Sequence, residues 1–134
     1  MSNEKKKQYL RRYLVAKRCI DLLLEQIESL RENKMSPSGT LDGMPHGSGT
    51  SDLSGYAARL DELMRELEAE REMQMVTYHE IWNQVKKIPN ATEQEVLTRR
   101  YLIGQSWEKI AVEMHYSYRQ IIRIHGAALQ HFSW

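Results

Sequence analysis

The chain has 134 residues and a formal net charge of +1, which is enough for one modest domain or for a small domain with a helical appendage. Apolar residues make up 41% of it and charged residues 28%, values that are ordinary for a soluble protein. No apolar run approaches the roughly 20 residues of a membrane span, so we expect no membrane partner. The single cysteine, Cys19, lies on an apolar stripe, which favours a buried free thiol in a reducing compartment and a cytoplasmic location.

Charge is unevenly distributed along the chain. Residues 1–18 contain seven Lys or Arg and one acidic residue, whereas residues 52–80 contain three Arg and eight acidic residues. This asymmetry indicates complementary surfaces, or a basic end that meets a polyanion. Two interpretations of the basic start stay open: contact with DNA phosphates, or ion pairs with the acidic middle of the second long helix, within or between chains.

Hydrophobic periodicity predicts two long helices, over residues 4–33 and 52–88. The segment between them, residues 35–51, has four Gly, two Pro and six Ser or Thr, a composition typical of a flexible loop. Pro89 ends the second helix. In the first helix the apolar stripe, which Leu24 widens, is Tyr13, Ala16, Ile20, Leu23, Ile27 and Leu30. The second helix has two stripes: Tyr56, Leu60, Leu63, Met64 and Leu67, then Tyr78, Ile81, Trp82, Val85 and Ile88.

Two amphipathic helices joined by a loop are expected to fold back as an antiparallel hairpin. Two helices alone cannot bury both of their stripes, so we expect the long helices to form a homo-oligomer or to bind a partner. The predicted domain organisation is therefore an oligomerisation or partner region over residues 1–88, followed by a C-terminal domain over residues 89–134.

The C-terminal region, residues 92–132, is predicted to form three short helices in series. Thr92 and Glu95 have the spacing of a capping box, in which each side chain accepts a hydrogen bond from the backbone amide of the other. The helix that they begin is expected to run to Ile103, with Gly104 supplying the left-handed residue after its end.

A tight turn is predicted between the second and third of these helices. Ser106 is the expected cap of the second helix, and His115 tolerates the left-handed conformation that the turn needs. Ser117 and Gln120 form a second capping box, which begins the last helix, residues 117–132. The inner face of the second helix is predicted to be Trp107, Ile110, Ala111 and Met114.

The last helix can be divided into two faces at about 100° per residue. Its predicted core side is Ile121, Ile124, Ala128, Leu129 and Phe132. The opposite side is Arg119, Arg123, Gly126 and Gln130, flanked by Gln120 and Ile122, and the helix contains no Asp or Glu. A helix-turn-helix places such a face in the DNA major groove, where Arg reads guanine, Gln reads adenine and Ile contacts a thymine methyl group. The candidate DNA-binding residues are Ser117, Tyr118, Arg119, Gln120, Ile122, Arg123 and Gly126.

These motifs resemble two known groups of proteins. The segment from Thr92 to Phe132 looks like region four of the sigma-70 family, which binds promoter DNA, and the run from Ser117 to Leu129 is the most specific part of the likeness. The whole layout, including the segment from Leu41 to Gly49, resembles the small phage regulators of the ArpU/RinA type, which are associated with activation of late phage genes.

The resemblance implies an all-α fold: a long N-terminal helical hairpin plus a C-terminal helix-turn-helix similar to sigma region four. It implies groove contacts by Tyr118, Arg119, Ile122 and Arg123. Sigma factors usually carry charged residues where Tyr118 and Ile122 stand, so the base preference of sigma factors is not carried over. No sigma region two is present in this sequence.

The expected function is sequence-specific binding of double-stranded DNA by a transcription regulator, a phage or prophage late-gene activator working with bacterial RNA polymerase in the host cytoplasm. Glu108 and Glu113, on the helix before the turn, are candidate polymerase contacts. The alternative is a small terminase subunit that recognises a phage packaging site, although such subunits often begin with their DNA-binding domain. A protein adaptor without DNA binding is a third possibility.

No enzyme signature is present, so we expect neither catalysis nor a cofactor. The sequence contains no glycine-rich phosphate loop and no nucleophile elbow, and its acidic run is typical of a solvated face. The histidines include no pair four residues apart on one helix face, so no metal site is expected. His125 is expected at the edge of the core and His131 on the surface.

Overall fold

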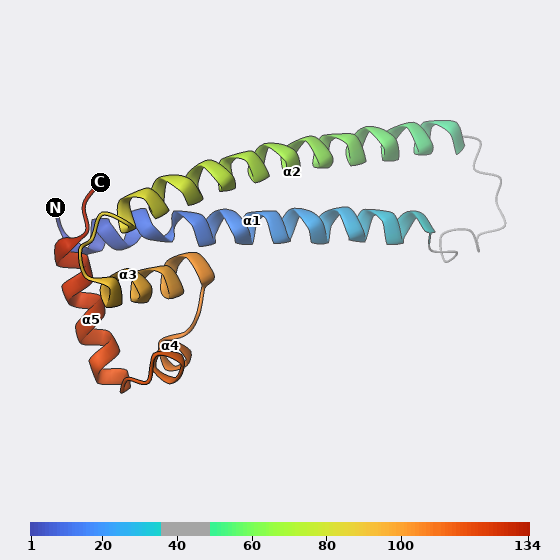
Figure 1. Cartoon of the computed structure of the whole chain (residues 1–134). Coiled ribbons are helices and arrows are strands. Elements are labelled where there is room, and N and C mark those ends of the chain that lie inside the picture. Colours follow the sequence, from blue (N-terminus) through green and yellow to red (C-terminus); the bar gives the residue numbers. More distant parts are fainter. Residues whose placement is uncertain (36–48) are drawn as a thin grey trace. The chain divides into compact units, whose positions relative to one another are not determined.

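The computed structural model describes residues 1–35 and 49–134, and these residues contain helices and no strand (Figure 1). The predicted all-α class is confirmed for them. The predicted loop over residues 35–51 falls largely on residues 36–48, which lie outside the described residues. The elements in chain order are α1 (Asn3–Met35), α2 (Gly49–Val85), α3 (Ala91–Leu97), the π-helical turn η2 (Thr98–Ile103), α4 (Trp107–Met114) and α5 (Tyr118–His131).

The second long helix ends earlier than its apolar pattern predicts. Regular α-helical structure stops at Val85, and the prediction that it continues to Ile88 was wrong. The amide of Ile88 donates to the carbonyl of Val85 at 3.1 Å, a tighter spacing of three residues. Pro89 follows and has no amide proton for the next helical hydrogen bond, so the helix ends before it.

One compact unit, Arg18–Glu72, consists of the distal part of α1 and the first part of α2. Leu24 and Met64, which belong to the predicted apolar stripes, are 39% and 43% exposed. Two helices cover only a narrow seam of each other, which leaves the flanks of each stripe in water. The core of the unit is Ile20, Leu23, Ile27, Leu63 and Leu67, with Cys19, Leu30 and Leu60 partly buried against it.

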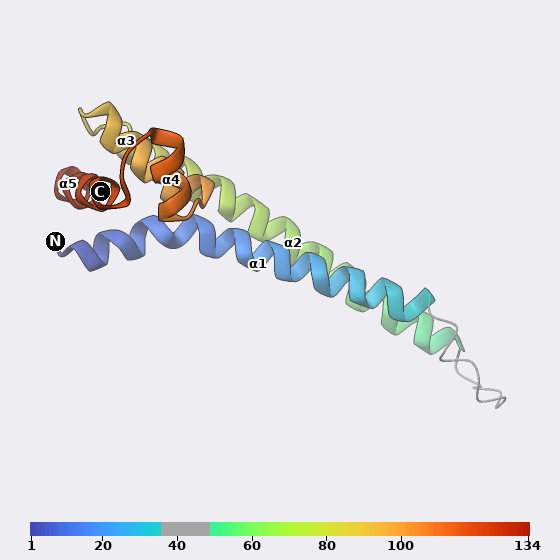
Figure 2. The same ribbon diagram turned by 90° about the horizontal axis from the view of Figure 1, so that it is seen from below.

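The other compact unit contains Met1–Lys17 and Met73–Trp134, which differs from the boundary that the sequence predicted between residues 88 and 89. In both views α5 lies beside the first turns of α1 (Figure 1, Figure 2). The short C-terminal helices bury their apolar sides on segments far away in the sequence. Their shared core is Tyr9, Leu10, Ile81, Val85, Ile88, Leu97, Tyr101, Leu102, Ala128, Leu129 and Phe132.

The start of α3 differs from the predicted capping box. Oδ1 of Asn90 accepts a hydrogen bond from the amide of Glu93 at 3.1 Å, so Asn90 is the cap and the box at Thr92 and Glu95 was wrong. Asn ranks above Thr as a helix cap, and here it stands two residues earlier. Glu95 instead forms an ion pair with Arg99 at 2.7 Å.

The end of this segment is only partly as predicted. An α-helix was expected to run to Ile103, but the hydrogen bonds over Thr98–Ile103 widen to the π-helical spacing. Gly104 is left-handed, with φ of 89°, as predicted. A side chain at Gly104 would also be crowded, because a Cβ atom there would lie 3.2 Å from Cδ2 of Leu14.

Candidate nucleic-acid interface

The connection between α4 and α5 is a three-residue turn. His115 takes the left-handed conformation, with φ of 60°, and is the one described non-glycine residue with positive φ. The amide of Tyr116 donates to the carbonyl of Ala111 at 3.0 Å, which closes the end of α4. Both the turn and the left-handed His115 agree with the sequence prediction. The cap of α4 was also predicted correctly, since Oγ of Ser106 accepts from the amide of Lys109 at 3.2 Å.

A complete capping box begins α5. Oγ of Ser117 accepts from the amide of Gln120 at 3.1 Å, and Oε1 of Gln120 accepts from the amide of Ser117 at 2.8 Å. This prediction is confirmed. It also limits the base-reading role expected of Gln120, because its carbonyl oxygen already holds the helix end and the amide NH₂ is the group left to donate.

A small apolar core holds α4 against α5. Ala111 is 6% exposed and lies where the two helices approach each other, as its small side chain predicts. The buried residues of this core are Val96, Ile110, Ala111 and Ile121, with Trp107, Met114 and Ile124 partly buried around them. The orientation of α5 is therefore fixed by packing on one side only, which leaves its other side in water.

The exposed side of α5 carries the residues that the sequence selected for DNA contact. Tyr118 is 50% and Ile122 38% exposed, and Arg119 and Arg123 are exposed beside them. Gly126 is half-buried, and a Cβ atom built on it would meet nothing within 4 Å. The structure therefore brings these residues together on one face of a single helix.

The arginines of this compact unit fall into two groups. Arg119 and Arg123 have no hydrogen-bond or ion-pair partner among the described residues. The other four arginines each have a carboxylate, a carbonyl or an aromatic ring as partner: Arg11 with Glu4, Arg12 with Glu80, Arg99 with Glu95 and Glu113, and Arg100 with the Gln105 carbonyl and the Trp107 ring. The two arginines of the unit that have no partner among the described residues thus both lie on the outer face of α5.

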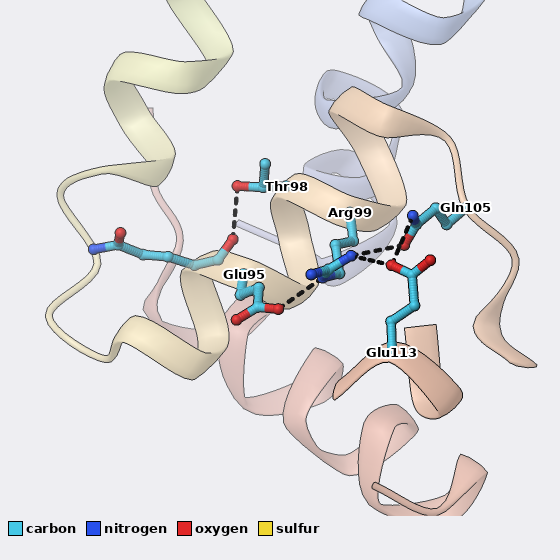
Figure 3. A network of polar contacts seen from close by, with 6 residues as sticks. Glu95, Thr98, Arg99, Gln105 and Glu113 are labelled. Atoms are coloured by element: carbon cyan, nitrogen blue, oxygen red, sulfur yellow. Dashed lines mark hydrogen bonds and ion pairs between the residues drawn. The ribbon is translucent and has the colours of Figure 1, made fainter. Parts of the chain in front are cut away.

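A polar network joins η2 to α4 (Figure 3). The guanidinium of Arg99 bonds to Glu95 at 2.7 Å and to Glu113, and Nε2 of Gln105 donates to Glu113 at 3.1 Å. The hydrogen bond that Arg99 donates to Glu95 is the main cause of the raised pKa of Arg99. Glu113, one of the two predicted polymerase contacts, therefore has a structural role. Glu108, the other, is exposed and has no partner among the described side chains.

The inner side of α5 carries a buried histidine. His125 is 7% exposed, its Nε2 lies 2.8 Å from the phenol oxygen of Tyr101, and its ring centre lies 4.5 Å from that of Trp107. Burial, together with the smaller effect of the positive charges of Lys7, Arg100 and Arg11, lowers the pKa of His125 to about 4. The sequence predicted a core-edge histidine but gave no indication of this pairing.

The C-terminal end of α5 is anchored to the basic start of α1. Nζ of Lys6 donates to the carbonyl of Leu129 at 2.6 Å and lies 3.5 Å from that of Gln130, carbonyls that have no amide partner at a helix end. Trp134 stacks on Tyr9, with ring centres 4.3 Å apart. Sequence reasoning missed both contacts, because their partners are more than 120 residues apart.

Two further contacts concern the predicted ion pairs and histidines. Arg12 forms an ion pair within the chain with Glu80 at 3.0 Å, near the end of α2 and not in its acidic middle. His131 is exposed, as predicted, and its Nδ1 lies 2.8 Å from the buried carboxylate of Glu93, which ties α5 to α3.

The described ranges contain no group of three or more His, Cys, Asp or Glu side chains arranged to hold a metal ion. Within the same ranges, none of the helices has the length and apolar character that crossing a membrane requires. The chain matches no protein-family model, no curated protein and no solved structure.

Proposed function

We propose that the protein is a sequence-specific double-stranded DNA-binding regulator of transcription, in which α4 and α5 act as a helix-turn-helix and α5 enters the major groove. The observation that carries this proposal is the acid-free outer face of α5, with two partner-free arginines one helical turn apart. The sharp turn at His115 and the capped start at Ser117 support it, because they give α5 a defined direction relative to α4. The resemblance to sigma region four points the same way.

The chemistry of this face suits the edges of base pairs. Arg119 and Arg123 lie four residues apart, so their side chains project from neighbouring positions on the helix surface. A guanidinium can bond to O6 and N7 of one guanine at the same time, and Ile122 beside them offers an apolar surface to a thymine methyl group. Tyr118, at the first turn, can donate its hydroxyl proton to a phosphate oxygen.

Binding can be tested with a randomised duplex library, from which the purified full chain should enrich a defined sequence. Arg123→Ala should then weaken binding of the selected duplex by about 1–3 kcal/mol and relax base preference at one position. Arg71→Ala, which removes an exposed arginine from α2, is the matched control and should change neither quantity. Failure of the wild-type chain to enrich any sequence, or equal binding by Arg123→Ala, would overturn the proposal.

The regulatory step is proposed to be activation of late phage genes together with bacterial RNA polymerase in the cytoplasm of the host. Glu108 is the better candidate for the polymerase contact, because the carboxylate of Glu113 is held by Arg99 and Gln105. Glu108→Lys should abolish activated transcription in vitro while DNA affinity stays within about 1 kcal/mol of wild type. A chain that binds its site but never changes transcript yield would favour the small-terminase alternative, whose readout is stimulation of a large terminase ATPase.

We also propose that the long helices associate into a homo-oligomer. Within the unit Arg18–Glu72, large apolar side chains among the described residues remain in water outside the buried core. The exposed members are Leu22 (53%), Leu24 (39%), Leu53 (52%) and Met64 (43%). Light scattering of the full chain at tens of micromolar, roughly the range in which weak interfaces are populated, should give a mass above that of the monomer. Leu22→Lys combined with Met64→Lys should return it to the monomer, and a wild-type monomer at that concentration would contradict the proposal.

A further inference from the structure

The first turns of α1 lie alongside the proposed recognition helix. The hydrogen bond of Lys6 to the Leu129 carbonyl, at 2.6 Å, fixes the position of α1 against α5 within their compact unit. Lys7 follows directly in the sequence, and Arg11 lies four residues later, so the two side chains are neighbours on one side of α1. The ammonium group of Lys7 has no partner among the described residues.

Arg100 brings a third positive charge to the same region from η2. Its guanidinium lies 4.4 Å from the centre of the Trp107 ring, and that ring lies 4.5 Å from the ring of His125 on α5. The hydrogen bond from Arg100 to the carbonyl of Gln105, at 3.0 Å, holds the guanidinium in this place. The positive charges of Lys7, Arg100 and Arg11 all contribute to the lowered pKa of His125, in agreement with their positions beside α5.

Little negative charge opposes this group. Glu4 is the one acidic residue among residues 1–18, and its carboxylate lies 3.5 Å from Arg11. The two side chains are 63% and 52% exposed, and such exposed ion pairs contribute little and exchange easily for another anion. Lys7, Arg11 and Arg100 therefore form a basic cluster next to α5 that a polyanion can approach.

We propose that this basic cluster, Lys7 and Arg11 of α1 with Arg100 of η2, contacts backbone phosphates of the duplex whose major groove α5 occupies. The inference rests on the proposed function, because it takes the orientation of the DNA from α5. A helix in the major groove has a row of phosphates along each wall, and basic side chains beside the helix meet those phosphates whatever the base sequence. The N-terminal helix thereby becomes part of the DNA-binding surface, with a role in affinity and none in base choice.

The test is the salt dependence of binding by the full chain. Each phosphate neutralised by a basic side chain contributes about −0.9 to the slope of log K against log salt. The double variant Lys7→Gln with Arg11→Gln should make the slope shallower by about 1.8, measured on the selected duplex between roughly 50 and 200 mM salt. It should weaken binding of the selected and of a scrambled duplex by the same factor and leave base preference unchanged.

The matched control is Lys17→Gln with Arg18→Gln, which removes the same charge from exposed positions about 15 Å further along α1. This control should keep the wild-type slope. The double variant Lys7→Arg with Arg11→Lys, which conserves both charges, should also have the wild-type slope. Suppose that the wild type binds in an Arg123-dependent manner but that Lys7→Gln with Arg11→Gln has the same slope as Lys17→Gln with Arg18→Gln. The proposed phosphate contacts of the basic cluster are then wrong, and the proposed function stands. If the wild type binds no duplex at all, both are overturned.

Discussion

The phenol oxygen of Tyr101 lies 2.8 Å from Nε2 of His125, and this pair joins η2 to α5 inside the core of the compact unit that also contains the start of α1. Tyr101 is 3% and His125 7% exposed, so water reaches neither group well. Burial raises the pKa of Tyr101 and lowers that of His125, which keeps both groups neutral at physiological pH. A neutral pair costs far less to bury than a charged one.

The first prediction follows from the pKa of about 4 at His125 against an ordinary value of 6.5. The unfolded chain takes up this proton near pH 6.5 and the folded chain only near pH 4, so the free energy of unfolding should fall as the pH drops through that window. The loss attributable to His125 is about 3 kcal/mol over the window. Urea unfolding at several pH values should therefore show a shallower pH dependence for His125→Gln than for wild type. Equal slopes would show that His125 is not the responsible group.

The second prediction concerns the lysine that caps α5. Lys6→Met removes the ammonium group from the carbonyls of Leu129 and Gln130 but keeps the length of the side chain. Because Lys6 is 9% exposed, water cannot fully replace that donor, and the free energy of unfolding should fall by about 1–3 kcal/mol. Lys5→Met changes the same residue type at an exposed neighbouring position and should stay within about 0.5 kcal/mol of wild type. Denaturant titrations that give equal stabilities for the two variants would argue against the cap.

Local features of the chain were predictable because their partners are close in sequence. The box between Ser117 and Gln120 and the left-handed His115 depend on three or four consecutive residues, and both were predicted correctly. The error at Thr92 was also local, because a better cap, Asn90, stands two residues earlier. Periodicity identified the inward side chains of α5 for the same reason.

The contacts that position the candidate site were not predictable from patterns. Lys6 caps a helix that begins more than 100 residues later, and nothing in the run of lysines distinguishes it from Lys5 or Lys7. Tyr101 and His125 are likewise paired only by the packing of η2 on α5. The predicted boundary between residues 88 and 89 treated the C-terminal helices as separate, whereas their apolar sides pack on α1 and α2.

The third prediction is that residues 89–134 do not fold when expressed alone. Leu97, Leu102 and Leu129 are 0%, 6% and 2% exposed, and part of the surface that covers them comes from α1 and α2. Removing residues 1–88 exposes this apolar surface to water, at a free-energy cost of about 25 cal/mol per Å². A fragment of this size buries too little other apolar surface to offset that cost. Circular dichroism of the fragment should show low helicity and no cooperative melting transition. A fragment that melts cooperatively would establish the boundary at residue 88 after all.

The fourth prediction addresses Ile122 and follows from the proposed function. Replacing thymine by uracil in the selected duplex removes only the C5 methyl groups that an exposed isoleucine can contact. Wild type should bind the uracil duplex more weakly, by about 1 kcal/mol for one buried methyl group. Ile122→Ala should bind both duplexes with similar affinity. A wild-type chain that is indifferent to the substitution would show that Ile122 does not read a methyl group.

The last prediction separates the structural from the functional requirement for glycine at position 126. Gly126 lies within α5, its φ is not positive, and a Cβ atom there would meet nothing within 4 Å, so no feature of the described structure requires glycine. Gly55 in α2 has the same properties and lies in the other compact unit. Glycine inside a helix costs roughly 0.5–1 kcal/mol relative to alanine. Gly126→Ala and Gly55→Ala should therefore both raise the free energy of unfolding by about that amount.

If the sugar-phosphate backbone approaches α5 at position 126, only Gly126→Ala should weaken binding of the selected duplex, so the two variants would have the same stability and different affinities. Equal affinities for both would remove Gly126 from the proposed interface and leave Arg119 and Arg123 to carry it.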